Sequence, residues 1–207
     1  MERPSTGGLS SGPPRPGSFL EPLVGKTSTF LLASRQDNLT FARAVVGLLG
    51  AEGPSCTVMD LDAFYSSHAD TILAPFSLQA DSWELMVPSP GSDIESELSR
   101  LFTVTSGGVV LDSLNTLYHL FSLEDGSSRG RRLAFALASL SYMARTNSKA
   151  VILCMYRREG FGRPGTTRAI SGLSDITASV EVQGPELFVR TERGSAWPGG
   201  AFSTRIP

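Results

Sequence analysis

The stretch Val109-Val110-Leu111-Asp112-Ser113-Leu114-Asn115-Thr116-Leu117, which follows Gly107-Gly108, decides the fold of this chain. Val-Val-Leu is short, rich in β-branched residues and preceded by a glycine turn signal, so the sequence predicts a buried strand. Such strands are typical of parallel sheets that helices cover on both faces. In these sheets ligands bind at the carboxyl ends of the strands, which is where Asp112 and Ser113 fall.

Two interpretations of Asp112 follow from this position. An aspartate at a strand end can hold a magnesium ion beside a nucleotide phosphate, directly or through water. The simpler interpretation is a strand followed by an Asp or Ser cap of a helix, and short apolar runs that end in Asp are common. Taken alone, the stretch favours the cap, so the choice depends on the neighbouring segments.

The bulk composition is that of a soluble globular chain with one domain. The 207 residues are 41% hydrophobic and 18% charged, and the formal net charge is -2. This charge does not indicate nucleic acid or membrane binding, so any basic surface must be local. Residues 1–18 are rich in Gly, Pro and Ser and predict a flexible tail, because they cannot bury enough apolar surface to order themselves. We expect a single domain over residues 19–207.

Cysteine and histidine usage predicts neither a disulfide nor a metal site. Cys56 and Cys154 lie in apolar, strand-like runs and are expected to be buried reduced thiols. Together with His68 and His119 they do not form a zinc spacing. No apolar run reaches the roughly 18 residues of a membrane span, and the N-terminus lacks an apolar signal core. We therefore expect the cytoplasm, or the nucleus in a eukaryotic cell.

The remaining segments alternate between strand and helix patterns, which predicts an α/β domain. The first strand, helix and second strand form a βαβ unit with a right-handed crossover. The expected elements in chain order are strand 28–33, helix 39–49, strand 56–62, strand 83–87, helix 92–102, strand 109–111, a polar loop 123–132, helix 133–146, strand 149–156, a basic loop 157–168, and closing strands 176–182, 186–191 and 201–206. Gly184-Pro185 joins the first two closing strands as a hairpin.

Three features of this order carry a family resemblance. They are the eight residues 33–40 after the first strand, Asp112 with Ser113, and the two arginine-rich segments 123–132 and 157–168. With the alternating elements, they resemble the core of the RecA/RadA/KaiC superfamily over roughly residues 28–206. The resemblance implies a mainly parallel twisted sheet flanked by helices, with antiparallel closing strands at the C-terminus. It also implies that Asp112 stands at the place of that superfamily's magnesium-coordinating strand.

The phosphate-binding loop of that superfamily is degenerate here. Its pattern G-x-x-x-x-G-K-[ST] brings backbone N–H groups, a lysine and a hydroxyl to a bound triphosphate. The same register reads Ala33-Ser34-Arg35-Gln36-Asp37-Asn38-Leu39-Thr40, in which only the threonine fits. The lysine is lost and an acid is gained, and both changes disfavour a triphosphate. We therefore expect no ATP or magnesium cofactor. If a nucleotide does bind, the degenerate site comprises Ser34, Arg35, Asn38, Thr40, Asp112 and Ser113.

Two clusters of basic residues suggest contact with nucleic acid. In recombinases that the chain resembles, the loops after the corresponding strands line the DNA path. An aromatic side chain between glycines can stack on a base, and clustered arginines can contact phosphates. The alternative is that these arginines are simply solvated. The candidate nucleic-acid residues are Arg129, Arg131, Arg132, Arg157, Arg158, Phe161, Arg163 and Arg168.

Three other residues each have a structural and a functional interpretation. Asp60 and Asp62 end the second strand, where related ATPases often place an acid that activates water. With a degenerate phosphate loop, strand-end capping is the favoured interpretation. Trp197 lies between closing strands, where a packing anchor is more common than a partner surface.

The leading functional hypothesis is a non-catalytic RecA-fold accessory or regulatory subunit. Members of the superfamily associate edge to edge, and subunits without phosphate loops occur in recombination-accessory complexes and in the Elongator tRNA-modification assembly. By this resemblance the chain would bind a RecA-like partner, or its own copies, and single-stranded DNA or RNA. One alternative is a divergent nucleotide hydrolase that uses Thr40 and Asp112, with Asp60 or Asp62 and with Arg35 in place of the lysine. The other alternative is a pure protein-interaction module.

Overall fold

The structure, a computed structural model, describes residues 18–52, 55–73, 83–89, 91–124, 128–157 and 172–205. The strands are β1 (Thr27–Leu32), β2 (Cys56–Asp60), β3 (Trp83–Met86), β4 (Gly108–Asp112), β5 (Ala150–Tyr156), β6 (Ile176–Gln183), β7 (Glu186–Arg193) and β8 (Ala201–Arg205). The helices are α1 (Arg35–Glu52), α2 (Phe64–Ser67), α3 (Ala69–Leu73), α4 (Ile94–Arg100), α5 (Leu114–Glu124) and α6 (Arg129–Thr146). Short 3-10 turns lie at Glu21–Leu23 and Pro198–Gly200.

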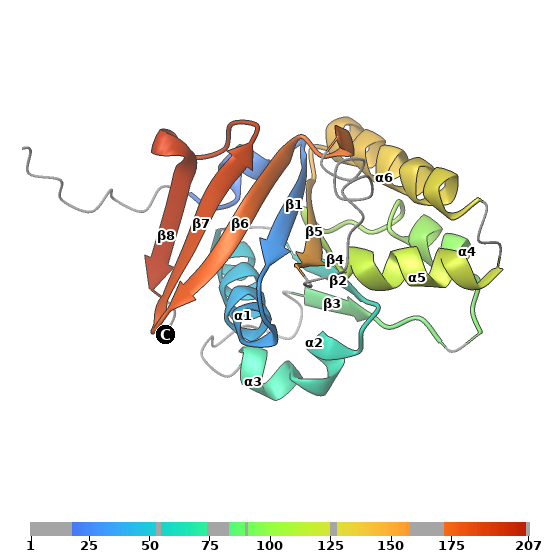
Figure 1. Cartoon of the computed structure of the whole chain (residues 1–207), viewed down its shortest axis with the longest axis horizontal. Helices are drawn as coiled ribbons and strands as arrows, with labels where there is room; N and C mark the ends of the chain where they lie inside the picture. The colour runs from blue at the N-terminus through green and yellow to red at the C-terminus, as the bar shows by residue number, and fades with distance from the viewer. Residues whose placement is uncertain are drawn as a thin grey trace, which may run out of the picture.

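Within these residues, all strands belong to one sheet in the order β3-β2-β4-β5-β1-β6-β7-β8 (Figure 1). The pairs from β3 to β6 are parallel. The pairs β6–β7 and β7–β8 are antiparallel. The expected fold class, a mainly parallel sheet with antiparallel closing strands, is confirmed. Parallel pairing brings the carboxyl ends of β1, β2, β4 and β5 to one edge of the sheet.

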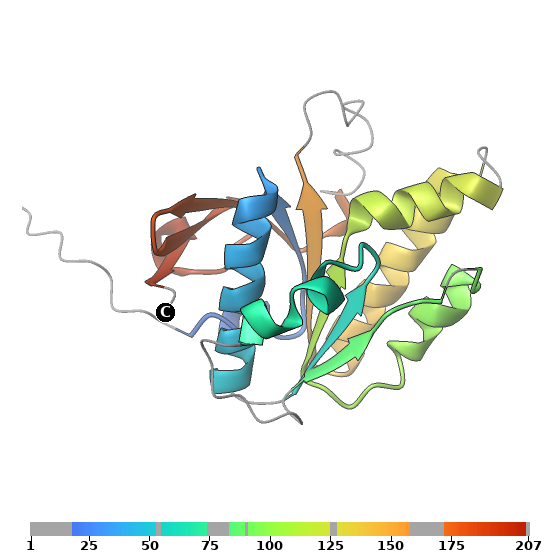
Figure 2. The ribbon, with the colours of Figure 1, turned by 90° about the horizontal axis from the view of Figure 1, so that it is seen from below.

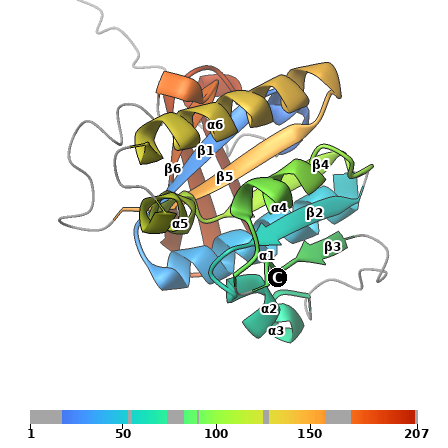
Figure 3. The same ribbon diagram turned by 90° about the vertical axis from the view of Figure 1, so that its right-hand side faces the viewer.

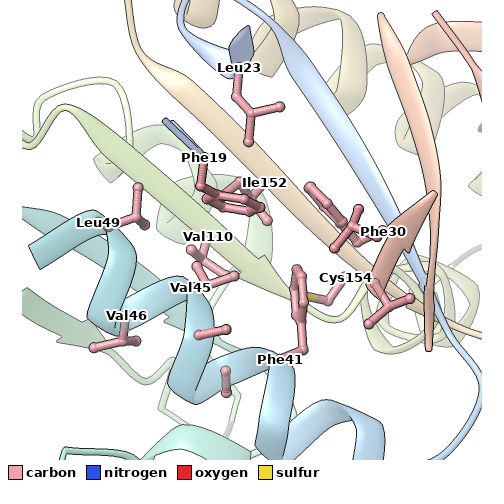
Figure 4. Packing of buried hydrophobic residues seen from close by; sticks show 14 of the residues in the cluster. Phe19, Leu23, Phe30, Phe41, Val45, Val46, Leu49, Val110, Ile152 and Cys154 are labelled. Atoms are coloured by element: carbon pink, nitrogen blue, oxygen red, sulfur yellow. The ribbon is translucent and has the colours of Figure 1, made fainter. Parts of the chain in front are cut away.

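Helices cover both faces of the parallel part of the sheet (Figures 2 and 3). One face packs against α1, and side chains from alternate positions of β4 divide between the two layers. Val110 belongs to the apolar cluster on the α1 side, together with Phe41 and Val45 (Figure 4). Val109 and Leu111 belong to the cluster on the α4, α5 and α6 side. β4 is therefore buried on both faces, as its sequence predicts.

The C-terminal strands close over an aromatic cluster. Trp197 is 5% exposed and stacks on Phe19, with ring centroids 5.7 Å apart. Phe202 of β8 packs against both rings. Trp197 is thus a packing anchor, as expected. Cys56 and Cys154 are buried free thiols, which also agrees with the sequence. In the part of the chain that the structure describes, no helix is long and apolar enough to cross a membrane.

Two predictions about helix boundaries are wrong. The segment 123–132 is expected to be a loop, but Leu123 and Glu124 belong to α5, and α6 begins at Arg129 and so contains the first arginine cluster; residues 125–127 lie outside the described residues. α1 begins at Arg35 instead of residue 39. In addition, α5 was not predicted, although Leu114, Leu117 and Phe121 recur at helical spacing and are fully buried.

Candidate functional site

The carboxyl group of Asp112 lies at the end of β4 and is covered by two side chains. Asp112 is 0% exposed. Asn38 of α1 donates from Nδ2 to Asp112 Oδ2 over 3.2 Å. The hydroxyl of Tyr156, at the end of β5, donates to both carboxyl oxygens of Asp112 over 3.3 and 3.4 Å. Asn38 Nδ2 also contacts the Tyr156 hydroxyl, so the three side chains form one buried polar group.

The position of Asn38 follows from an early start of α1. Ser34 Oγ accepts a hydrogen bond of 3.1 Å from the backbone N–H of Asp37, which is the geometry of an N-cap. The Asn38 N–H already bonds to the carbonyl of Ser34 over 3.2 Å. Residues 35–40, which stand in the register of the phosphate loop, therefore form the first turns of a helix and do not wrap around an anion. This helix directs Asn38 into the protein.

Thr40 does not share the side of α1 that faces Asp112. It stands two residues after Asn38 in a continuous helix, and side chains at i and i+2 do not face each other. Asn38 is buried, whereas Thr40 is only partly buried. The structure thus brings Asn38 to Asp112 but separates both from Thr40, and the Ser113 hydroxyl bonds to Asp62 and Thr116 instead. The side chain of Arg35 lies outside the described part of the structure.

Burial controls the charge of this polar group. The pKa of Asp112 is raised from 3.8 to about 7, chiefly by burial and to a smaller extent by the negative charges of Asp62 and Asp60, while the hydrogen bonds from Asn38 and Tyr156 oppose the shift. Burial also raises the pKa of the Tyr156 phenol well above its ordinary value, so the phenol stays a donor. The Asp112 carboxyl therefore changes protonation near neutral pH.

Of the two acids near the end of β2, Asp60 caps a helix and Asp62 bonds to hydroxyl groups. Asp60 accepts hydrogen bonds of 2.8 Å from the backbone N–H groups of Phe64 and Ser66 at the start of α2. Asp62 is exposed and accepts from the Ser113 hydroxyl over 2.8 Å, and it also accepts from the Thr116 hydroxyl. Capping, the favoured interpretation of both residues, therefore holds for Asp60, whereas Asp62 accepts from side-chain hydroxyls. Their carboxylates are engaged with α2 and with the first turn of α5.

Ser113 and Asn115 join the end of β4 to its neighbours. Ser113 Oγ accepts from the Thr116 N–H over 3.3 Å, so Ser113 caps α5. Asn115 Oδ1 accepts from the Tyr156 N–H over 2.8 Å, and Asn115 Nδ2 donates to the Tyr156 carbonyl over 3.3 Å. Sequence reasoning missed both Asn115 and Tyr156. A polar residue three positions after Asp112 and a tyrosine ending a strand were the available signals.

The RecA resemblance suggests magnesium-ATP as the ligand at the carboxyl ends of these strands. The residues present there do not fit it. The one acid in the expected magnesium position is sealed by Asn38 and Tyr156. No loop encircles a phosphate between β1 and α1, because the helix is already formed at Arg35. A phosphate would have to displace the Asn38 amide from a buried carboxyl. Among the residues that the structure describes, no group of three or more His, Cys, Asp or Glu is placed to hold a metal ion.

The candidate nucleic-acid residues occupy several environments. Arg131 is exposed in the first turn of α6. Arg132 donates to Glu95 over 2.8 Å and lies 4.8 Å from the centre of the Phe121 ring, so it also stabilises the contact between α4, α5 and α6. Arg157 follows β5 and pairs with Glu192 of β7. The side chain of Arg129 and the whole of Arg158, Phe161, Arg163 and Arg168 lie outside the described residues.

Comparison with known proteins supports the fold. A solved structure titled as the RadB recombinase superposes with a TM-score of 0.65 at 14% sequence identity, and the match covers 89% of each chain. This likeness establishes a RecA-like fold for the chain. No protein-family model matches the sequence, and no curated protein matches it.

Proposed function

We propose that the chain is a non-catalytic RecA-fold subunit that assembles with a RecA-like partner and contacts single-stranded nucleic acid. The observation that carries the non-catalytic part is the pair of side chains that cover Asp112. Asn38 and the Tyr156 hydroxyl both bond to this carboxyl, which is fully buried. A carboxylate that binds magnesium must have oxygen atoms free to contact the ion or its bound water. The Asp112 oxygen atoms instead accept hydrogen bonds from an amide and a phenol.

Titration with magnesium-ATP tests this part. We expect no saturable heat by calorimetry and no phosphate release above the rate without protein. The matched variants are Asp112→Asn, which changes the sealed acid, and Asp62→Asn, which changes the exposed acid at the same edge. Binding in the wild type that disappears in Asp112→Asn and persists in Asp62→Asn would show a divergent nucleotide site and contradict the proposal.

The nucleic-acid part rests on the placement of two arginines. Arg157 directly follows the carboxyl end of β5. Arg131 lies in the first turn of α6, the helix that leads into the amino end of β5. Clustered arginines bind phosphates with little dependence on sequence, and such binding weakens as salt rises. The recombinase that the fold resembles makes a nucleic-acid ligand a reasonable first test.

Fluorescence anisotropy with labelled single strands of about 30 nucleotides tests this part, because single-strand sites usually span less than this length. We expect binding of DNA or RNA at low salt, and a triple change of Arg157, Arg158 and Arg163 to Ala should weaken it. The slope of log affinity against log salt should fall by about 2, because each lost phosphate contact on a single strand contributes about 0.7.

The control for this experiment is a triple change of Arg100, Arg190 and Arg205 to Ala, all of which are exposed elsewhere. It removes the same charge and should leave the slope unchanged. If the wild type binds no single strand at low salt, the nucleic-acid part is wrong. A stable complex with a RecA-like protein that responds to neither nucleotide nor nucleic acid would indicate a pure interaction module.

A further inference from the structure

The outer face of α6 carries an exposed stripe that the fold does not use. Arg131, Phe135, Ala138, Tyr142 and Arg145 are all exposed and follow one another at intervals of four, three, four and three residues. Phe135 is 73% exposed and Tyr142 is 68% exposed, the largest values among the large hydrophobic side chains that the structure describes. The opposite face of α6 buries Leu133, Leu137, Leu140 and Ala144. We call the five exposed residues the α6 stripe.

The spacing of the α6 stripe is that of a helix-pairing seam. Intervals of four and three residues repeat every seven, and apolar residues at this repeat pack against a second helix. Ala138 lies between the two aromatic side chains and leaves a gap that a large side chain of another helix can fill. Phe135 and Tyr142 are therefore placed as two knobs with a hole between them.

The charges of the α6 stripe differ at its two ends. Arg145 is already paired with Asp175 over 2.7 Å. Arg131 is exposed and makes no ion pair with the described part of the chain. It also lies in the first turn of α6, where the helix dipole favours negative charge nearby. An occupant of this face is thus favoured if it brings a carboxylate to the Arg131 end.

We propose that the α6 stripe is a docking surface for an amphipathic helix of another protein, whose apolar seam covers Phe135, Ala138 and Tyr142 and whose acidic end lies against Arg131. This surface is distinct from the Asp112 edge, so it stands or falls independently of the proposed lack of nucleotide binding. It supplies a partner-binding element that the proposed function requires but does not locate.

Three other occupants fit the α6 stripe less well. Two copies of this chain would bring arginines together, because an antiparallel pair sets Arg131 beside Arg145 and a parallel pair sets Arg131 beside Arg131. Residues 1–17 are rich in Gly and Pro and lack an apolar helical repeat. Nucleic-acid bases stack about 3.4 Å apart, whereas Phe135 and Tyr142 are about 10.5 Å apart along the helix axis, since each residue rises about 1.5 Å.

A designed peptide provides a direct test with the full chain. The probe is a labelled helix of about three heptads with leucine at positions a and d and glutamate in both end turns, used where it is monomeric. A second peptide carries lysine in place of each glutamate. By fluorescence anisotropy, we expect the glutamate peptide to bind about tenfold tighter than the lysine peptide. The variant Arg131→Glu should reverse this preference.

The apolar part of the surface is tested by Phe135→Ser combined with Tyr142→Ser. This pair should weaken binding of the glutamate peptide about tenfold or more, which is the usual effect of removing buried aromatic anchors. The matched control is Val24→Ser with Val87→Ser, two exposed apolar residues elsewhere, and it should leave binding unchanged. Circular dichroism should show the same melting temperature for all variants, because every changed side chain is exposed.

Four outcomes would overturn the proposal. The first is no binding of the glutamate peptide to the wild type. The second is equal affinity of the wild type for the two peptides, or equal affinity of the wild type and the aromatic double variant for the glutamate peptide. The third is a wild-type dimer in sedimentation that dissociates in the double variant, because the occupant is then a second copy. The fourth is displacement of the peptide by a single-stranded oligonucleotide whose own binding is lost in the double variant. None of these outcomes bears on the magnesium-ATP titration.

Discussion

β4 and β2 both end at a buried aspartate, and a third aspartate that follows β2 is exposed. Asp60 and Asp112 are register partners in neighbouring parallel strands. Asp112 is sealed beneath the side chains of Asn38 and Tyr156. Two residues beyond the end of β2, Asp62 is exposed and is bonded by the hydroxyls of Ser113 and Thr116. Water can therefore reach the carboxyl group of Asp62 but not that of Asp112.

The difference between Asp112 and Asp62 shows how strongly the covering side chains affect what an acid near a strand end can do. A buried carboxyl loses its contact with water. This loss raises its pKa and makes hydrogen-bond donors inside the protein necessary. An open carboxyl can exchange any lost donor for water. In this chain, the sealed acid joins α1, β4 and β5, and the open acid accepts from two hydroxyl groups at the start of α5.

Removing one donor from each acid gives the largest contrast. Asn38→Ala takes a hydrogen bond from a buried carboxyl and leaves the Tyr156 hydroxyl with one partner fewer, so we expect a loss of about 3 kcal/mol in the free energy of unfolding. Thr116→Val takes a donor from exposed Asp62 and keeps the shape of the side chain, so we expect a loss below about 0.5 kcal/mol. Denaturant unfolding measures both.

The same two variants can also break the contrast. Equal losses would mean that water reaches both acids or neither, and the seal over Asp112 would not exist in solution. A far-ultraviolet circular dichroism spectrum that matches the wild type is the control that each variant keeps the fold. The m-value should also stay constant, because a change would indicate a different denatured state.

The pH dependence of stability sharpens the contrast further. The pKa of Asp112 is about 7 in the folded protein, raised from 3.8 by burial. Between these values the folded state holds the proton more tightly than the unfolded state, so stability falls as pH rises through this window. The contribution is fully present below about pH 3.8 and lost above about pH 7. Asp112→Asn cannot titrate at this position and lacks the dependence.

The measurement compares the wild type with Asp112→Asn at pH 5 and pH 8. The wild type should lose on the order of 2 kcal/mol of unfolding free energy relative to the variant over this interval. Asp62→Asn serves as the control for the other carboxyl and should follow the wild type. If the wild type and Asp112→Asn change in parallel, Asp112 is already ionised at pH 5 and its environment is wetter than the structure indicates.

The sequence predicts the sheet well because its signals are local. β4 is an apolar run bounded by glycine and aspartate, and β2 and β5 are also short, mostly apolar runs. The start of α6 is less visible, because Arg129 to Arg132 are polar and look like loop residues. Gly130 weakens the helix signal of this segment, and the contacts of Arg132 with Glu95 and Phe121 come from distant parts of the chain. Propensity alone does not contain this information.

Only part of the candidate site can be predicted from the sequence, because the rest depends on contacts between distant residues. Asp112 is recognisable from its place after a buried strand, and Asn38 from its register in the degenerate phosphate loop. Their bond is not predictable, because it requires α1 to begin at Arg35 and so turn Asn38 inward. Tyr156 is separated from Asn38 by 118 residues, and the fold alone brings these side chains together. A family pattern describes what the loop has lost, whereas the structure shows what replaced it.

Of the changes at the two buried acids, the smaller effect belongs to Asp60, which is buried like Asp112 but bonded by backbone groups. Asp60→Ala removes the acceptor for the N–H groups of Phe64 and Ser66, so we expect a loss of about 1 kcal/mol, as for other helix caps. Amide exchange at these two residues should accelerate, while exchange in β4 stays slow. Asp60→Asn keeps one side-chain carbonyl oxygen as an acceptor, so it should show only part of the loss in stability seen for Asp60→Ala. The cap orders only the short helix α2, so its loss should cost little. If Asp60→Ala destabilised the protein as much as Asn38→Ala, burial of the acid alone would determine the loss in unfolding free energy.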